Sequence, residues 1–320
     1  MSEQALLSVE NLVVDYGRRH RRVQAVSGVS FAVPERQTLG LVGESGSGKS
    51  TTGRCVSFVQ RPTGGTVRFA GTDLSTLPAR ELRRARTKLQ MVFQDPISSL
   101  NPRRKVIDIV AEPLAIWGGV NRKEMMRRAA DMLEAVGMDP AVTGNRRPGE
   151  LSGGQCQRIS VARALMLEPA LLVCDEPVSA LDVSVQAQIL NLLTDLKERY
   201  GLTMLFIAHD LAVVKATSDR VAVMYLGKLC ELGPVEDLYL SPQHPYSAAL
   251  VDAVPVPDPR RPVAGPPLSG DMPSPADPPS GCRFRTRCPF AQDICAIEEP
   301  PLEEIAPGHL VACHFPTSSR

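Results

Sequence analysis

One stretch of the sequence decides the fold of this chain: Gly43-Glu44-Ser45-Gly46-Ser47-Gly48-Lys49-Ser50. It matches the pattern G-x-x-x-x-G-K-S and stands between an apolar run, residues 38–42, and a stretch with helical spacing, which is the setting of a phosphate-binding P-loop. Its glycines let backbone N–H groups converge on phosphate oxygens, and the start of the helix adds the positive end of its dipole. A surface turn rich in Gly and Ser is the alternative, but the fixed positions in this setting favour a nucleoside triphosphate site.

Two side chains at the end of this loop have specific expected roles. Lys49 is expected to reach the β- and γ-phosphates, and the Ser50 hydroxyl is expected to bind Mg²⁺. We count all eight residues of the loop, together with Thr51, as nucleotide-binding.

Outward from this loop, short apolar runs mark further strands. Residues 170–174 and 203–208 share the character of 38–42, and all three are typical of buried parallel strands. Extended chain is expected around 26–33, and a hairpin within 220–232.

Helical patterns lie between these strands. From Val185 to Leu196 the apolar residues recur on one helical face, and Gly201 follows as a stop signal. A second helix is expected to start at about Arg122, with Asn121 as its N-cap, and to end at Gly137. The fold class is therefore α/β, with antiparallel strands added at the edge.

Composition excludes several classes of protein. The chain has 320 residues, of which 43% are hydrophobic and 22% charged, so intrinsic disorder is not its main state. Its net charge of only +1 argues against a nucleic-acid partner. No apolar run reaches the roughly 20 residues of a membrane span, and the first residues do not read as a secretion signal, so we expect a cytosolic chain.

An acidic pair follows the apolar run 170–174. Asp175 is expected to hold Mg²⁺ or its water shell, because a carboxylate just past a buried strand does this in P-loop proteins. Glu176 then lies where a carboxylate accepts a proton from the attacking water. A solvated strand end is the alternative, which the upstream P-loop makes the weaker one.

A second helix N-terminus that can bind an anion is expected at Leu151-Ser152-Gly153-Gly154-Gln155. With this LSGGQ sequence the chain resembles the ATP-binding subunits of ABC transporters. The other elements of that family are present in order: Tyr16, Gln94 in the Q-loop, Asp175 and Glu176, a D-loop at 179–182, and His209.

The resemblance implies a role for each of these residues. Tyr16 stacks on adenine, Gln94 contacts Mg²⁺ and the attacking water, and Asp175 binds Mg²⁺. Glu176 is the general base, and His209 contacts the γ-phosphate and holds Glu176 and water in line.

The resemblance also implies that two subunits pair head to tail. Ser152, Gly153, Gly154 and Gln155 then contact the nucleotide held by the partner. Cys156 departs from the Arg or Lys that the family often carries there, with little expected effect on the chemistry.

The resemblance narrows to one branch of the family. The segments 94–103, 111–114, 209–214 and 241–246 look like those of dipeptide/oligopeptide importers. This implies an ATPase that energises peptide import from the cytoplasmic face of the inner membrane. Its implied partners are a second ATPase subunit, usually a paralogue, two permease subunits and, indirectly, a substrate-binding protein.

Proline marks the domain boundary. Ten of the 25 residues from Pro255 to Pro279 are proline, a density that neither helix nor central strand tolerates. We expect an ABC ATPase domain at 1–254 with a helical subdomain at about 95–160. A linker at 255–281 and a Cys-rich extension at 282–320 would follow.

Four of the eight cysteines crowd this extension: Cys282, Cys288, Cys295 and Cys313. Four cysteines in a reducing compartment favour a thiolate metal site, either Zn²⁺ or an iron–sulfur cluster. The wide spacing lacks the tight pairs of structural zinc, and some members of the resembled branch carry a [4Fe-4S] cluster here, so iron–sulfur is expected. Unligated thiols are the alternative, and His309 and His314 leave a mixed-ligand site open.

Other functions remain to be weighed against peptide import. A nickel or other small-solute importer would use the same ATPase subunit. A chromosome or DNA-repair ATPase would need a long coiled-coil insertion before the LSGGQ sequence, and no sustained heptad is present there. A basic run at 18–22 is typical of a solvated loop, with attraction to anionic lipid headgroups as the alternative.

Overall fold

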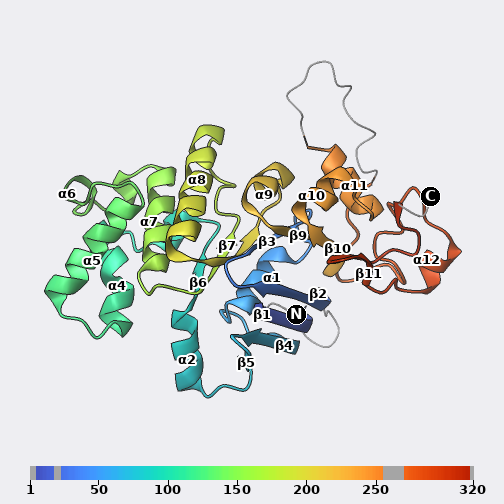
Figure 1. Cartoon of the computed structure of the whole chain (residues 1–320), viewed down its shortest axis with the longest axis horizontal. Helices are drawn as coiled ribbons and strands as arrows, with labels where there is room; N and C mark the ends of the chain where they lie inside the picture. The colour runs from blue at the N-terminus through green and yellow to red at the C-terminus, as the bar shows by residue number, and fades with distance from the viewer. Residues whose placement is uncertain (1–4, 18–22, 255–269, 318–320) are drawn as a thin grey trace. The chain divides into compact units, whose positions relative to one another are not determined.

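The computed structural model describes residues 5–17, 23–254 and 270–317 of the chain (Figure 1). It divides into two compact units. The P-loop unit contains the described residues of 7–33, 38–75 and 206–317, and the helical unit contains those of 5–6, 34–37 and 76–205. The basic run at 18–22 and most of the Pro-rich linker, 255–269, lie outside the described residues.

The P-loop unit holds most of the strands. These strands are β1 (Ala5–Tyr16), β2 (Val23–Pro34), β3 (Thr38–Val42), β4 (Gly64–Phe69), β5 (Thr72–Asp73), β9 (Arg220–Tyr225), β10 (Lys228–Pro234), β11 (Glu303–Ala306) and β12 (His309–Val311). Its helices are α1 (Lys49–Val56), α9 (Leu211–Thr217), α10 (Val235–Leu240), α11 (Pro245–Asp252) and α12 (Asp293–Ile297).

Two sheets organise this unit. One has the order β2-β1-β4-β5, with β4 antiparallel to both β1 and β5. The other has the order β11-β12-β10-β9-β3. In it β3 is parallel to β9, and the pairings of β9 with β10, β10 with β12 and β12 with β11 are antiparallel. The hairpin expected within 220–232 is therefore present as β9 and β10. The C-terminal extension, red in Figure 1, adds β12 next to β10 and β11 next to β12, although the sequence had suggested only a separate tail.

The helical unit is built around two parallel strands, β6 (Leu89–Val92) and β7 (Leu171–Asp175). Strand β8 (Thr203–Ile207) begins in this unit. The helices are α2 (Ala79–Thr87), α3 (Pro96–Ser99), α4 (Val106–Trp117), α5 (Arg122–Ala135), α6 (Pro140–Thr143), the 3₁₀ turn η1 (Pro148–Glu150), α7 (Gly153–Leu165) and α8 (Val183–Tyr200).

Local sequence accounts for these elements. Every residue of β3, β7 and β8 is buried, as expected for strands covered on both faces. The side chain of Asn121 caps α5 by accepting the Glu124 N–H, and Gly201 ends α8 in the left-handed conformation with φ 61°. Among the described residues, no helix combines the length and apolar character that a membrane crossing requires.

Candidate functional site

The backbone of the phosphate-binding loop in the P-loop unit needs its glycines. Gly43, Gly46 and Gly48 all have positive φ, between 81° and 148°. A Cβ on Gly43 would stand 2.0 Å from the Met224 carbonyl oxygen, and one on Gly48 would stand 2.3 Å from that of Ala25. Because neither position has room for a side chain, the loop requires glycine at both, as a phosphate-binding loop does.

Lys49 closes this loop from inside. Its side chain is only 4% exposed, and Nζ donates hydrogen bonds to the carbonyl oxygens of Gly43 at 2.7 Å and Glu44 at 2.9 Å. The Ser47 hydroxyl is buried and has no hydrogen-bond partner among the described residues. A cradle without room for side chains, a buried cation and an unsatisfied hydroxyl fit a bound phosphate group.

Ser50 and Thr51 lie in the first turn of α1, directly after the loop, and both are half-buried. Tyr16 ends β1 in the same unit. Its ring is 41% exposed, and its hydroxyl donates a 2.7 Å hydrogen bond to Gln60 Oε1. An exposed ring held by its hydroxyl suits the predicted stacking on adenine, which stays a prediction.

The acidic pair lies at the end of β7 in the helical unit. Asp175 is buried, whereas Glu176 is half-buried and has φ 47°, a conformation that non-glycine residues rarely adopt. Gln94 Nε2 donates a 2.9 Å hydrogen bond to Glu176 Oε2. The structure thus brings together two of the predicted catalytic side chains, and the strained backbone at Glu176 is of the kind that concentrates at functional sites.

The LSGGQ sequence begins α7 in the same unit. Ser152 Oγ accepts the Gln155 N–H at 3.3 Å, while Gln155 Oε1 accepts the Ser152 N–H at 3.0 Å, which forms a capping box. A Cβ on Gly154 would meet Val185 Cγ1 at 2.5 Å. The second glycine is therefore required by close packing on α8, in addition to any contact with nucleotide.

Two more predicted residues have clear positions. His209 follows β8 in the P-loop unit and is exposed, so its predicted role beside Glu176 of the helical unit stays a prediction. Cys156 is buried in α7, and its thiol donates to the Pro148 carbonyl oxygen at 3.5 Å. This departure from the family pattern fills interior space.

The four cysteines of the extension lie near one another. Burial, together with smaller contributions from the nearby thiols of Cys295, Cys313 and Cys288, raises the pKa of the Cys282 thiol to about 11. Within the described residues, however, no group of three or more His, Cys, Asp or Glu side chains is arranged to hold a metal ion. The thiols gather, but they do not form a ready metal site, and the predicted iron–sulfur cluster has no support in this geometry.

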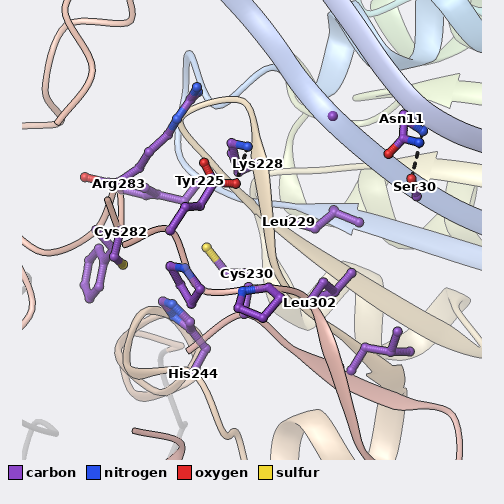
Figure 2. A pocket seen from close by; sticks show the side chains of 17 residues that line it. Asn11, Ser30, Tyr225, Lys228, Leu229, Cys230, His244, Cys282, Arg283 and Leu302 are labelled. Carbon is purple, nitrogen blue, oxygen red and sulfur yellow. Dashed lines mark hydrogen bonds and ion pairs between the residues drawn. The ribbon is translucent and has the colours of Figure 1, made fainter. Parts of the chain in front are cut away.

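Sequence reasoning missed a fifth cysteine. Cys230 on β10 lies close to Cys282 and Cys313, and burial raises the pKa of its thiol well above the ordinary value. With Cys282 and His244 it lines a cavity of about 400 Å³ in the P-loop unit (Figure 2). No local spacing links Cys230 to the other cysteines, because β10 precedes the linker.

A buried hydrogen bond joins His309 of the extension to Glu231 on β10. His309 Nε2 lies 2.7 Å from Glu231 Oε1, and the same carboxylate accepts the N–H groups of Gln243 and His244. Burial alone would raise the pKa of Glu231, but these hydrogen bonds lower it below the ordinary value. His309 thus has a structural partner in place of the metal that the sequence had left open.

Comparisons with known proteins place the chain in the family that the LSGGQ sequence indicates. A family model described as ABC transporter matches residues 26–179, and one described as the oligopeptide/dipeptide transporter C-terminal region matches 230–295. A Brucella ovis protein named for peptide import ATP binding is 53% identical over 98% of both chains. The oligopeptide transport ATP-binding protein AppF of Bacillus subtilis is 50% identical over 94% of this chain and 92% of its own.

Solved structures show the same fold. The ATP-binding cassette MJ0796, in a dimeric post-hydrolysis state with ADP and phosphate, is 28% identical with a TM-score of 0.66. The match spans 72% of this chain and 98% of the MJ0796 chain. CbiO1 of Clostridium perfringens, part of an ABC transporter complex, has the same TM-score at 25% identity. This match spans 74% of this chain and 92% of the CbiO1 chain.

Proposed function

Because this chain belongs to the ATP-binding subunits of ABC transporters, we propose that it hydrolyses ATP to drive the import of di- and oligopeptides through a membrane transporter. The resemblance inferred from the LSGGQ sequence, the ABC-type α/β fold and the ATPase activity that follows from them are confirmed. The cargo is supported by relatives that match nearly the whole chain and are named for peptide transport. No observation favours nickel, another small solute or DNA repair.

The observation that carries the proposal is the geometry of the phosphate-binding loop. Backbone N–H groups and Lys49 hold the triphosphate, and the exposed ring of Tyr16 stacks on the base. Mg²⁺ supplies charge neutralisation of the phosphates, and Ser50, Gln94 and Asp175 offer the hydroxyl, amide and carboxylate oxygens that this cation prefers.

The remaining residues act on water and on the partner subunit. Glu176 accepts the proton of the attacking water, and the Gln94 amide fixes the orientation of its carboxylate. His209 contacts the γ-phosphate and holds Glu176 and the attacking water in line. Ser152, Gly153, Gly154 and Gln155 present the start of α7 to the nucleotide of a second ATPase subunit.

The wider assembly follows from the same proposal. We assign the chain to the cytoplasmic face of the membrane, attached to two permease subunits and paired with a paralogous ATPase, with a substrate-binding protein acting from the other side. We also propose the division into an ATPase domain (1–254, helical subdomain about 95–160), a linker (255–281) and an extension (282–320). The [4Fe-4S] cluster at the four cysteines stays a proposal that iron analysis tests.

Transport by the whole complex tests this function. The chain, its permeases, its ATPase partner and its binding protein are reconstituted in vesicles, and uptake of a labelled dipeptide is measured with and without ATP. ATP-dependent peptide uptake is expected, and a complex carrying Glu176→Gln in this chain is the matched control. Uptake of nickel without uptake of peptide would contradict the assigned cargo.

A further inference from the structure

One arginine of the C-terminal extension contacts the phosphate-binding loop directly. Nη1 of Arg287 lies 2.9 Å from Oε1 and 3.0 Å from Oε2 of Glu44, the second residue of the loop, from 243 positions away in the sequence. The Arg287 side chain is only 6% exposed, whereas that of Glu44 is 29% exposed. An ion pair so well shielded on one side is far less weakened by solvent than a surface pair.

Glu44 is bound to the rest of the loop through its main chain. Its carbonyl oxygen accepts hydrogen bonds from Lys49 Nζ at 2.9 Å and from the Ser47 N–H at 3.2 Å. Its N–H donates to the hydroxyl of Tyr246 at 2.9 Å. A shift of the Glu44 main chain would therefore move the carbonyl oxygen that Lys49, the residue expected to meet the phosphates, binds.

An aromatic wall holds Arg287 in place. Tyr225 contacts both Tyr246 and Phe284 edge to face, with ring centroids 4.8 and 5.2 Å apart, and Arg287 Cζ lies 5.8 Å from the centre of the Tyr225 ring. Both tyrosines and Phe284 are buried. Phe284 and Arg287 come from the extension, and the two tyrosines come from β9 and α11, so the packing fixes the guanidinium beside the loop.

The charge of Glu44 makes this contact consequential. A carboxylate in a loop that receives a triphosphate repels the ligand unless a cation neutralises it. Arg287 supplies that cation, and removing one member of a shielded pair leaves the other charge uncompensated.

We propose that Arg287 is a positioning residue for the nucleotide site: it neutralises Glu44 and holds it against the extension, so that the loop meets the phosphates without an opposing charge. The extension is then a working part of the ATP site. This inference rests on the proposed function, because it requires ATP at the loop.

Nucleotide affinity of the full-length chain tests the inference. Titration with a fluorescent ATP analogue and Mg²⁺ gives Kd, and turnover at saturating ATP is measured alongside. Arg287→Gln is expected to raise Kd about tenfold while turnover at saturation changes less than about twofold. Adding Glu44→Gln to Arg287→Gln is expected to restore most of the affinity, because the uncompensated carboxylate is gone.

The controls separate the effect of the uncompensated Glu44 charge from a general loss of packing in the extension. Arg285, whose guanidinium donates to Ser280 within the extension, provides the matched variant Arg285→Gln, and its Kd is expected to equal that of the wild type. Arg287→Lys, which keeps the charge, is expected to recover most of the affinity. A double variant as weak as Arg287→Gln would overturn the inference, as would an unchanged Kd in Arg287→Gln.

Three further outcomes are decisive. If Arg287→Gln does not fold, the same change is made in the Glu44→Gln background, where it is expected to alter Kd less than about threefold, and a tenfold loss there contradicts charge compensation. If the wild-type chain binds no ATP, the proposed function fails. If the wild type binds ATP and Arg287→Gln binds it equally well, only the inference about Arg287 fails.

Discussion

The phosphate-binding loop (residues 43–50) and the cysteine-rich extension (residues 282–317) both belong to the P-loop unit, yet they are built in opposite ways. The loop is shaped by its own backbone, with three glycines at positive φ and Lys49 bonded back to the loop carbonyls. The extension is shaped by contacts with distant residues such as Glu231 and Glu44. The contiguous loop motif is enough to predict the geometry of its site. The widely spaced cysteines predict only that their side chains lie near one another.

The largest effect is expected outside both regions, and it sets the scale for the others. Glu176→Gln removes the proton acceptor and is expected to lower turnover by a factor of about 10²–10⁴ while ATP still binds. Turnover assays and ATP titration of the same preparation measure the two quantities. Full residual hydrolysis would show that another group accepts the proton.

Within the loop, Lys49→Ala is expected to weaken ATP binding about 100-fold, because two charge-assisted contacts with phosphate are lost. Nucleotide titration measures the loss. Lys88, whose Nζ donates to the Glu168 carbonyl oxygen at the surface of the helical unit, offers Lys88→Ala as a matched control. Unchanged affinity in Lys49→Ala would show that the loop motif does not form the phosphate site by itself.

The contact between Glu231 and His309 of the extension is expected to affect stability more than ATP chemistry. Glu231 has a pKa lowered from its ordinary value of 4.5, so its contribution to stability is complete above that pH and is lost as the pH falls through the folded value. Glu231→Gln is expected to cost about 1–3 kcal/mol at pH 7, and less at pH 4. Urea unfolding at both pH values measures this, and an equal loss at both would count against the assigned cause.

The smallest effect on ATP chemistry is expected from the cysteines. With a thiol pKa of about 11, Cys282 is protonated at pH 7.5 and should react slowly with iodoacetamide in protein without metal. Anaerobic protein that is brown and bleaches with a reductant would establish the iron–sulfur proposal. A colourless protein that contains zinc would replace it, and rapid alkylation would show that the thiols are more exposed than the structure indicates.

Sequence alone predicted the parts of the molecule that depend on neighbouring residues. The buried strands β3, β7 and β8, the cap at Asn121 and the stop at Gly201 follow from local pattern. The pairing of Gln94 with Glu176 was not deduced from spacing, and the roles of both residues came from family resemblance.

The contacts that sequence could not reveal join distant segments. Nothing in the local pattern links Arg287 to Glu44, or Cys230 to Cys282, because the members of each pair lie far apart in the sequence and meet only in the folded chain. Gly154 shows the same limit, since its packing on Val185 depends on how two helices meet.

The pairing of β12 with β10 has a practical consequence for shortened forms of the chain. In the full chain the hydrogen-bonding groups of β10 are covered by β9 on one side and by β12 on the other. A form ending at the Pro-rich linker would leave one side of β10 bare, and a bare strand edge recruits strands from other molecules. Such truncated protein should self-associate, whatever the state of its nucleotide site.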